Sequence, residues 1–367
     1  MEYEFIGLKE VKKDEYDGFV LAGDVSGTNT SLAIAGVTEK SIDPLFALRF
    51  KSQELSGITE ALNETLKISA EKFGIHVSKA CLSPAGPINA GRDHCKLTNT
   101  SWDIDVKKVL SDTLLESLTL INDFEAIGFG IPYLNEEDPK DMIKLTHPHN
   151  KLPKPVAKAV KGIVGAGTGL GKSILIYNTE KGNYVPSPSE GGHEDFAVVD
   201  SFEFELMNFV KNKRGGEAPV DFEDVLSGRG IVAIYEFLID REVFKTNKIS
   251  EDIDSAKDKV AIISQHAESD PACKKAFKIF IRFYARALRN TALNLMARGG
   301  MYIAGGIASK NMEFFTDGDL MKEFEVNHTQ HNVLKEIPVF IIKNYNISLY
   351  GAANVAANFP ELAIKKG

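Results

Sequence analysis

The sequence contains little cysteine and no long apolar run. Cys81, Cys95 and Cys273 are too few and too scattered for a disulfide framework or a four-ligand zinc site. This usage favours a reducing compartment, so we expect a cytoplasmic protein. No segment reaches the roughly 18 consecutive apolar residues of a transmembrane helix, which predicts no membrane partner. The first residues mix charges of both signs and therefore do not resemble a secretory signal.

An excess of basic charge is also lacking. The 43 Lys and Arg residues are outnumbered by 51 Asp and Glu residues, which gives a net charge of −8. This balance disfavours a nucleic-acid partner bound on a basic face. Anionic ligands would have to be held by backbone N–H groups or by a metal ion. The remaining composition, 43% hydrophobic and 26% charged over 367 residues, is that of a globular protein with room for more than one domain.

Runs of β-forming residues alternate with helical patterns. Residues 19–37, 79–99, 162–177 and 299–311 each combine such a run with a glycine turn. Residues 56–74 have apolar side chains at helical spacing after a possible cap at Ser56. The longest helical pattern, residues 270–300, has Pro271 in its first turn. This alternation predicts an α/β fold.

Residues 135–161 interrupt this alternation. The segment holds four prolines, many charges and little periodicity, so we expect a surface excursion close to a domain division. His147 and His149 fall within it. We expect them to be solvated loop histidines rather than metal ligands. The N-terminal arm before residue 19 is expected to be a short helix or an ordered arm.

The first glycine turn joins two strand-like runs at residues 24–29. With Gly27 at its tip, successive backbone N–H groups can converge on a phosphate, and the side chains of Thr28 and Asn29 can add donors. Asp24, at the end of the first run, can hold a phosphate-bound Mg²⁺ ion through its water ligands. The alternative is an ordinary hairpin turn.

The second glycine turn, residues 165–173, nearly spells a P-loop. Ala166 occupies the position of the first glycine of that motif, and Ser173 begins a β-branched run rather than a helix. We therefore reject the P-loop interpretation and expect a hairpin whose turn contains Gly167, Thr168 and Gly169. Such a turn could flank the same polyphosphate as the first one.

A third glycine pair, Gly305 and Gly306, follows the strand-like residues 301–304. A nucleoside base or ribose could lie against this backbone, although a plain strand-to-helix turn explains the glycines equally well.

Polar residues cluster in further segments. Asn122 and Asp123 follow a β-run, where an Asp faces the ligand crevice of an α/β sheet or caps the next helix.

Glu190 and His193 are separated by two glycines, a spacing that suits hydrogen bonds to neighbouring sugar hydroxyls. A structural histidine remains an alternative, and a zinc pair is disfavoured because further ligands are lacking nearby. Further candidates for the same cleft are Glu223, Asn99 and Trp102, although Glu223 alone indicates a surface residue and a single Trp is more often part of a core.

Several motifs together resemble one family. In chain order they are LAGDVSGTNTSLAI, LINDFEAIGFGIP, GAGTGLG, PSEGGHEDFA, EDVLSGRGI and GGMYIAGGI. From about residue 19 to the C-terminus the sequence is similar to the bacterial-type glucokinases of the hexokinase–actin–heat-shock ATPase superfamily. The resemblance implies a two-domain ribonuclease H-like fold with an interdomain cleft. We expect a small α/β domain of residues 1–123 plus 344–367 and a large one of residues 124–343.

The resemblance also implies an activity. ATP would phosphorylate the 6-hydroxyl of glucose with Mg²⁺ as cofactor, and the relatives commonly form homodimers. Asp123 would accept the hydroxyl proton. Sugar contacts are implied for Asn122, Glu190, His193 and Glu223, contacts to phosphate or Mg²⁺ for Asp24, Gly27, Thr28, Thr168 and Gly169, and an approach to adenosine for Gly305 and Gly306.

The sequence departs from the family pattern in places. Ser26 and Gly27 stand where first loops of the family usually have two glycines, and Ser26 adds a possible donor. The N-terminal arm and residues 135–161 look longer than typical. A cysteine-rich zinc motif does not follow His193, which excludes the repressor-and-kinase branch that carries one. Another hexose, polyphosphate as the donor, or a non-catalytic sugar sensor on the same fold remain alternatives.

Overall fold

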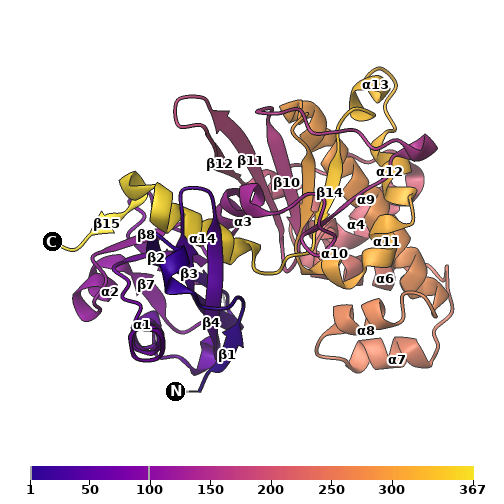
Figure 1. Cartoon of the computed structure of the whole chain (residues 1–367). Coiled ribbons are helices and arrows are strands. Elements are labelled where there is room, and N and C mark those ends of the chain that lie inside the picture. The colour runs from indigo at the N-terminus through magenta and orange to yellow at the C-terminus, as the bar shows by residue number, and fades with distance from the viewer. Residues whose placement is uncertain (1, 98–99) are drawn as a thin grey trace. The chain divides into compact units, whose positions relative to one another are not determined.

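The computed structural model describes residues 2–97 and 100–367 (Figure 1). The chain divides into two compact units. The first consists of Met1–Asn135, Tyr184–Pro186 and Asn344–Gly367, and the second of Glu136–Asn183 and Ser187–Lys343. This division differs from the expected one at residues 124–135 and 184–186, which belong here to the first unit.

The first unit is built on a mixed sheet with the strand order β1-β4-β3-β2-β5-β8-β15. Strands β2, β5 and β8 are parallel, so their carboxyl ends meet at one edge of the sheet. The strands are β1 (Glu4–Gly7), β2 (Gly18–Val25), β3 (Asn29–Val37), β4 (Ile42–Lys51), β5 (Lys79–Pro84), β8 (Ser117–Leu120) and β15 (Ile364–Lys365). The N-terminal arm is ordered, because β1 pairs with β4 in antiparallel register.

The two faces of this sheet pack against different helices. Because successive side chains of a strand point to opposite faces, Leu21 enters one core while Val20 and Ala22 enter the other. The Leu21 core includes side chains from α1 (Ile58–Phe73) and α2 (Val106–Asp112). The opposite core includes side chains from α3 (Asp123–Gly130) and α14 (Ile347–Asn358). A short ribbon, β6 (His94–Lys96) with β7 (Asp103–Asp105), completes the unit.

Helices α3 and α14 cross at glycines. A Cβ atom on Gly351 would lie 1.8 Å from the carbonyl oxygen of Ala126, and one on Gly130 would lie 2.4 Å from that of Ile347. The two backbones can approach this closely only where a side chain is missing. This contact places α3 in the first unit, and α3 begins with Asp123.

The expected end of α1 is confirmed, whereas its expected cap at Ser56 is wrong. The helix ends at Gly74, which adopts the left-handed conformation with φ 60°. Its N-cap is Gly57, one residue after Ser56.

The second unit is built on a sheet with the strand order β12-β11-β10-β13-β14-β9. Strand β13 is parallel to β10 and β14, whereas β11 is antiparallel to β10. The strands are β9 (Met142–Lys144), β10 (Lys161–Ala166), β11 (Leu170–Asn178), β12 (Asn183–Ser189), β13 (Met301–Ala304) and β14 (Val339–Ile342).

Helices α4 to α13 complete the second unit. The longest, α9 (Pro271–Leu295), begins where expected but ends before the expected residue 300, and its C-cap Met296 has a φ of 46°. The carboxylate of Asp270 caps it by accepting the N–H groups of Ala272 and Cys273, each at 2.9 Å. The other helices are α4 (Ser201–Arg214), α5 (Phe222–Val225), α6 (Gly228–Asp240), α7 (Lys248–Ser255), α8 (Lys259–Gln265), α10 (Gly306–Lys310), α11 (Met312–Thr316), α12 (Asp319–Phe324) and α13 (His331–Leu334).

Residues 135–161 are better anchored than expected. Strand β9 pairs with β14, and His147 is buried. Its Nδ1 lies 2.7 Å from a carboxylate oxygen of Glu325 and its Nε2 lies 2.9 Å from the carbonyl oxygen of Ile337. The prediction of a solvated histidine is therefore wrong for His147, while His149 is exposed.

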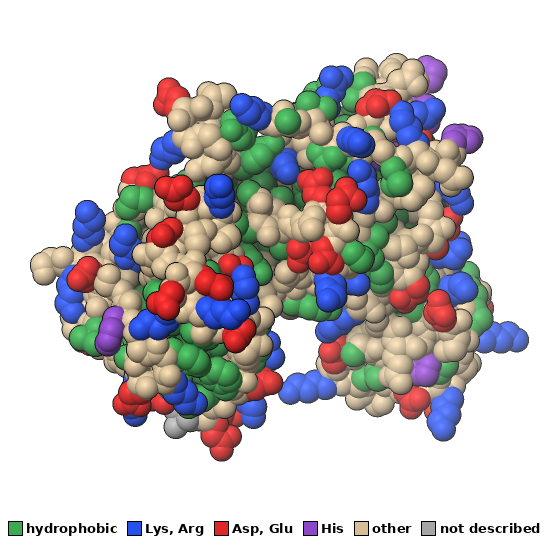
Figure 2. Space-filling model, viewed as in Figure 1, with side chains coloured by type: hydrophobic (Ala, Val, Ile, Leu, Met, Phe, Trp, Pro, Cys, Tyr) green, Lys and Arg blue, Asp and Glu red, His purple; other side chains and the backbone are tan. Residues whose placement is uncertain are grey.

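The distribution of surface charges and the state of the cysteines agree with what the composition predicts. Figure 2 shows basic and acidic side chains interspersed over the visible face. Within the described residues, all three cysteines are buried and form no disulfide. None of the helices in residues 2–97 and 100–367 combines the length and apolar character needed to cross a membrane.

Candidate functional site

The first glycine turn is a hairpin between β2 and β3. The Ser26 N–H donates to the carbonyl oxygen of Asn29 at 2.9 Å, and the Asn29 N–H donates to the Ser26 hydroxyl at 3.2 Å. The same hydroxyl donates to the Asn29 carbonyl at 3.0 Å. Ser26, expected as an additional phosphate donor, thus closes the turn, and Thr28 and Asn29 are exposed at its tip.

Two acidic residues lie at the carboxyl edge of the first sheet. Asp24 lies near the end of β2, opposite Ser83 of β5, and Asp123 follows the end of β8. Burial, followed by the negative charge of Asp123, raises the pKa of Asp24 to about 6. The two carboxyl groups are therefore close enough to repel each other, although 98 residues separate them in the chain. Ligands of α/β proteins bind at this edge of the sheet.

The start of α3 is held by a capping box. Asn122 is the N-cap, and its side-chain oxygen accepts the Phe124 N–H at 2.8 Å. Glu125 accepts the Asn122 N–H at 2.9 Å. Asp123 also accepts the Phe124 N–H, at 3.0 Å. The capping role considered for Asp123 therefore belongs mainly to its neighbour Asn122. Because the side-chain oxygen of Asn122 is used in the cap, its side-chain NH₂ is the group that could bind a sugar.

Behind this helix start lies an ion pair that the sequence analysis missed. Arg92 contacts Glu125 with both terminal nitrogens and donates to the carbonyl oxygen of Leu120 at 3.1 Å. Arg92 has a φ of 54°, a conformation that a non-glycine residue seldom adopts. Nothing in the local sequence signals this pair, because its partners are 33 residues apart.

The second glycine turn is also a hairpin. Strand β10 pairs with β11 in antiparallel register, and Ser173 lies within β11. The rejection of a P-loop is therefore confirmed. In the turn, the Gly167 N–H donates to the Gly169 carbonyl at 2.8 Å, and Thr168 is exposed. The first N–H of α6, from Gly228, donates to the Gly167 carbonyl at 2.9 Å.

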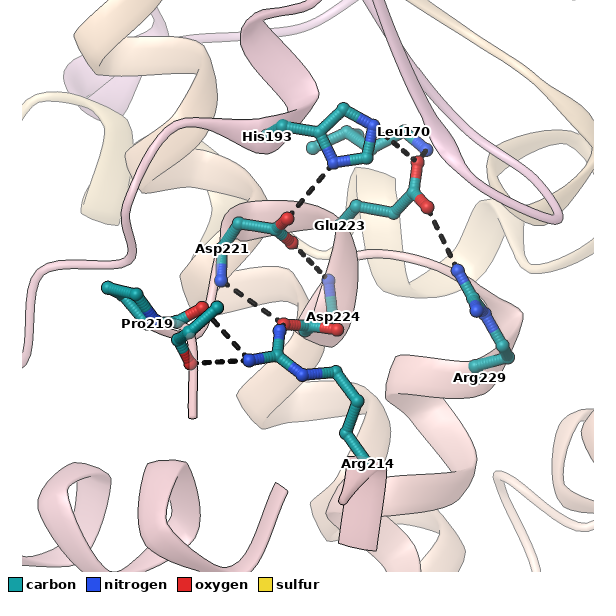
Figure 3. A network of polar contacts seen from close by, with 9 residues as sticks. Leu170, His193, Arg214, Pro219, Asp221, Glu223, Asp224 and Arg229 are labelled. Carbon is teal, nitrogen blue, oxygen red and sulfur yellow. Dashed lines mark hydrogen bonds and ion pairs between the residues drawn. The ribbon is translucent and has the colours of Figure 1, made fainter. Parts of the chain in front are cut away.

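Glu223 reaches this second turn (Figure 3). One of its carboxylate oxygens accepts the Leu170 N–H at 3.0 Å, and the other accepts from Arg229 at 2.9 Å. A Cβ atom on Gly169 would lie 2.5 Å from the Leu170-bonded oxygen. A carboxylate expected to bind sugar is thus in contact with a turn expected to bind phosphate.

His193 lies beside Glu223 in the same network. Its Nε2 is 3.9 Å from the Glu223 carboxylate, and its Nδ1 is 3.0 Å from that of Asp221 (Figure 3). The hydrogen bond to Asp221 is the main cause that raises the pKa of His193, and the negative charges of Glu223, Asp221 and Glu190 add to it against the opposing effect of burial. The structure thus brings Glu190, His193 and Glu223 together in the second unit.

The third glycine pair lies next to the second turn. Gly305 has a φ of 93°, and a Cβ atom on it would lie 2.4 Å from the carbonyl oxygen of Ala166, the last residue of β10. Both the backbone conformation and the space therefore require glycine at this position. Gly306 begins α10 directly afterwards, and both glycines are exposed.

Comparison with known proteins decides the family. The model of the family described as Glucokinase matches residues 21–359. The chain belongs to the glucokinase family. A glucokinase from a Nostoc species is 34% identical over 353 residues, which cover 92% of this chain and 98% of the relative.

Solved glucokinase structures share the fold. A glucokinase from an Antarctic psychrotroph superimposes with a TM-score of 0.76 at 25% identity, covering 93% of this chain and 99% of its own. A glucokinase from Balamuthia mandrillaris, in complex with glucose, gives 0.73 at 25% identity and covers 92% and 93%. A ROK family glucokinase from Streptomyces griseus, in complex with glucose and AMPPNP, shares the fold with a TM-score of 0.59 at 17% identity and covers 92% and 99%. The two-domain actin-like ATPase fold is confirmed.

Among the candidate residues of this glucokinase-family chain, Trp102 takes the core position that was the alternative to the cleft, and Asn99 is not described. Trp102 belongs to the core of the first unit, where its Nε1 donates to the carbonyl oxygen of Ser52 at 3.0 Å. Asn99 lies outside the described residues. The contacts of Asp221 and Arg229 with the candidate sugar ligands were not predicted. Asp221 stands two residues before Glu223 as the N-cap of α5, a position that signals a cap rather than a site residue.

Proposed function

We propose that the chain is a glucokinase that transfers the γ-phosphoryl group of ATP to the 6-hydroxyl of glucose, giving glucose 6-phosphate and ADP. The observation that carries this proposal is the placement of Asp24 and Asp123 at the carboxyl edge of the first sheet, where the charge of Asp123 helps to raise the pKa of Asp24, in a chain that matches the glucokinase family model over residues 21–359. The family supplies the reaction, and the two acidic residues supply groups that suit its proton transfer and its metal ion.

Asp123 is the proposed base. Phosphoryl transfer passes through a loose transition state, so the protein mainly positions the reactants and neutralises charge. The hydroxyl proton leaves late in such a reaction, and a carboxylate of ordinary basicity is sufficient to accept it. Asp123 is half-buried at the first turn of α3, where Asn122 and Glu125 fix the backbone.

Glu190, His193 and Glu223 are the proposed sugar ligands of the second unit, and Asn122 that of the first. Carboxylates and an imidazole that match several hydroxyls discriminate among sugars, because an absent or inverted hydroxyl leaves a polar group without its partner. Asn99 is retained as a proposed sugar contact on the resemblance alone.

The glycine turns are the proposed nucleotide contacts. Exposed backbone at Gly305 and Gly306 suits adenosine, and the two hairpin turns suit the phosphates. The proposed phosphate contacts are Gly27, Thr28, Asn29, Gly167, Thr168 and Gly169. Ser26 is proposed to support the first turn.

Mg²⁺ is the proposed metal ion. The donor chemistry fits, because Asp24 is a carboxyl group whose ionisation is disfavoured by burial and by Asp123, and a nearby cation would relieve both effects. The described residues contain no cluster of three or more His, Cys, Asp or Glu side chains arranged for a metal. This agrees with an ion that phosphate oxygens and water coordinate and that Asp24 holds through its water ligands. When bound, Mg²⁺ neutralises charge on the transferred phosphoryl group.

The deciding experiment is a sugar panel. Purified protein is assayed with glucose, mannose, fructose and N-acetylglucosamine, each with ATP, with inorganic polyphosphate or without a donor. Glucose with ATP should give the highest kcat/KM. Highest activity with another sugar or with polyphosphate would replace the proposed substrate or donor. Sugar binding without turnover would indicate a sensor, and ATP hydrolysis that no sugar stimulates would indicate an ATPase.

Location and assembly complete the proposal. A cytoplasmic location is supported by the absence of disulfides in the described part of the chain. A homodimer is proposed from the resemblance. Sedimentation of the purified protein at micromolar concentration tests the homodimer, and a monomer mass would exclude it.

A further inference from the structure

Asp221 contacts both segments that carry the proposed sugar ligands of the second unit. One carboxylate oxygen lies 3.0 Å from Nδ1 of His193 (Figure 3). The other accepts the Asp224 N–H at 2.9 Å and so caps α5, the helix that carries Glu223. The Asp221 N–H donates in turn to the Asp224 carboxylate at 3.2 Å, which completes a capping box. One side chain therefore connects His193 to the helix of Glu223.

The backbone around Asp221 fixes this connection. The Phe196 N–H donates to the Val220 carbonyl at 2.9 Å, and the Phe222 N–H donates to the Glu194 carbonyl at 3.0 Å. Asp195 and Asp221 face each other in an isolated antiparallel bridge. The segment after His193 is thus paired with the segment before Glu223, so the position of the Asp221 carboxylate relative to the imidazole is set by main-chain bonds.

Further contacts hold the capping box from behind. Arg214 pairs with the Asp224 carboxylate and donates to the Ala218 carbonyl and, at 3.1 Å, to the Pro219 carbonyl (Figure 3). The Asp221 side chain is 21% exposed, whereas the His193 side chain is 53% exposed. The carboxylate is therefore the more enclosed partner, and the imidazole is the one that a ligand can reach.

The contact determines where the protons of His193 lie. An ionised carboxylate only accepts hydrogen bonds, so Nδ1 of His193 must carry a proton in this pair. The Nε2 atom lies 3.9 Å from the Glu223 carboxylate, and its protonation depends on the charges around the ring. Those charges are the carboxylates of Asp221, Glu223 and Glu190, and the Glu223 carboxylate is itself paired with Arg229.

We infer that Asp221 is a positioning residue of the sugar site: it holds the His193 ring with Nδ1 protonated and so presents Nε2 to a sugar oxygen. The carboxylate also favours the imidazolium form, in which Nε2–H donates to that oxygen. This inference rests on the proposed function. Asp221 acts through His193 and through the cap of α5, and it does not itself touch the sugar. In the absence of its carboxylate, the ring can rotate or change tautomer, and Nε2 becomes an acceptor near neutral pH.

The test separates the two contacts of Asp221. Asp221→Ser retains an N-cap oxygen, since serine is a good cap, but its short side chain lacks the carboxylate that binds His193. Asp221→Asn retains the shape and an acceptor while removing the charge. The matched control is Asp195→Ser, which removes an exposed carboxylate from the opposite position of the same bridge.

Kinetics give the first readout. Asp221→Ser should raise KM for glucose about tenfold at about pH 7, the effect of a lost charge-assisted hydrogen bond, with kcat and KM for ATP changed less than about threefold. Loss of glucose affinity on raising the pH should begin at lower pH than in the unsubstituted protein. Asp221→Asn should show the same changes to a smaller extent, and Asp195→Ser should match the unsubstituted protein. Equal increases in both KM values, or an unchanged KM for glucose, would overturn the inference.

The titration of His193 gives a second readout that needs no activity. Its imidazole signal, assigned by comparison with His193→Gln, should titrate at lower pH in Asp221→Ser than in the unsubstituted protein, because the hydrogen bond from Nδ1 to the Asp221 carboxylate is lost. An unchanged titration would overturn the inference even if the protein phosphorylates glucose. A lowered titration in a protein without sugar kinase activity would support the His193–Asp221 coupling and reject the proposed function. If Asp221→Ser does not fold, Asp221→Asn carries the same two measurements.

Discussion

Arg92 holds the carboxylate of Glu125 with both terminal nitrogens, at 2.9 and 3.3 Å. The Glu125 side chain is 6% exposed, and the same carboxylate accepts the N–H of Asn122. Through Glu125, the ion pair therefore supports the start of α3 at Asn122. The residue after Asn122 is the proposed base, Asp123. A buried carboxylate in this position keeps its hydrogen bonds only while a cation balances its charge.

Removing the cation should loosen the start of α3. Arg92→Leu should lower the free energy of unfolding by about 2 kcal/mol, because it leaves Glu125 buried without a partner. It should also lower kcat by roughly tenfold, since Asp123 loses its fixed backbone. Urea denaturation and a coupled assay measure the two effects. In a double-mutant cycle with Glu125→Gln the losses should be less than additive, and strict additivity would show that the pair is not coupled.

Replacing the proposed base should separate binding from transfer. Asp123→Asn keeps the size of the side chain and an oxygen that can accept the Phe124 N–H, but it cannot take a proton. We expect kcat to fall by about 10²–10⁴-fold, the usual contribution of a general base, while the Kd for glucose measured by calorimetry changes little. A turnover number near that of the unsubstituted protein would remove Asp123 from this role.

The contribution of Asp24 to the free energy of unfolding should depend on pH. Its pKa is raised from 3.8 to about 6, with burial as the first cause and Asp123 as the second. A carboxyl group with a raised folded-state pKa stabilises the fold at low pH and loses this contribution as the pH rises through the folded-state value. Asp24→Asn cannot ionise and avoids that loss.

The stability difference between Asp24→Asn and the unsubstituted protein should therefore grow with pH. We expect the variant to gain about 1 kcal/mol in the free energy of unfolding between about pH 5 and about pH 8, because only the last part of the change, from pH 5 to the folded-state pKa of about 6, lies in this window. Denaturation at the two pH values, without nucleotide, measures this gain. The variant should also lose about 10²-fold in kcat/KM for ATP in the presence of Mg²⁺, if Asp24 holds the ion. A stability difference that is equal at both pH values would contradict the assigned pKa.

The elements around the site were predictable from local sequence, because their signals are short. Gly74 ends α1, Pro271 begins α9, and the β-branched run after Ser173 gives a strand instead of the helix that a P-loop needs. Each of these signals acts on the backbone within a few residues. The family motifs added the order of the loops and the identity of the proposed base.

The contacts that join distant segments were not predictable in this way. His147 looked like a loop histidine because its partner Glu325 is 178 residues away. Asp221 looked like a plain helix cap, and its contact with His193 depends on pairing between two segments 28 residues apart. Polar residues in such positions acquire a role only from tertiary packing, which the spacing along one chain does not reveal.

The crossing of α3 and α14 should be sensitive to a single methyl group. On Gly351 a Cβ atom would lie 1.8 Å from the backbone oxygen of Ala126, and backbone cannot move aside as a flexible side chain does. Gly351→Ala should therefore push α3 away and lower the free energy of unfolding by about 1–3 kcal/mol, the usual cost of overpacking. Because α3 begins with Asp123, kcat should fall as well, by more than KM for ATP rises.

Gly18→Ala is the matched control for this substitution, because a Cβ atom on Gly18 would meet nothing within 4 Å. It should leave both the free energy of unfolding and kcat within experimental error of the unsubstituted protein. If Gly351→Ala lowers stability without lowering kcat, α3 has moved as a rigid body that keeps Asp123 in place, and the link from helix packing to the proposed base is disproved. If it changes neither, the close approach of the two helices does not exist in solution.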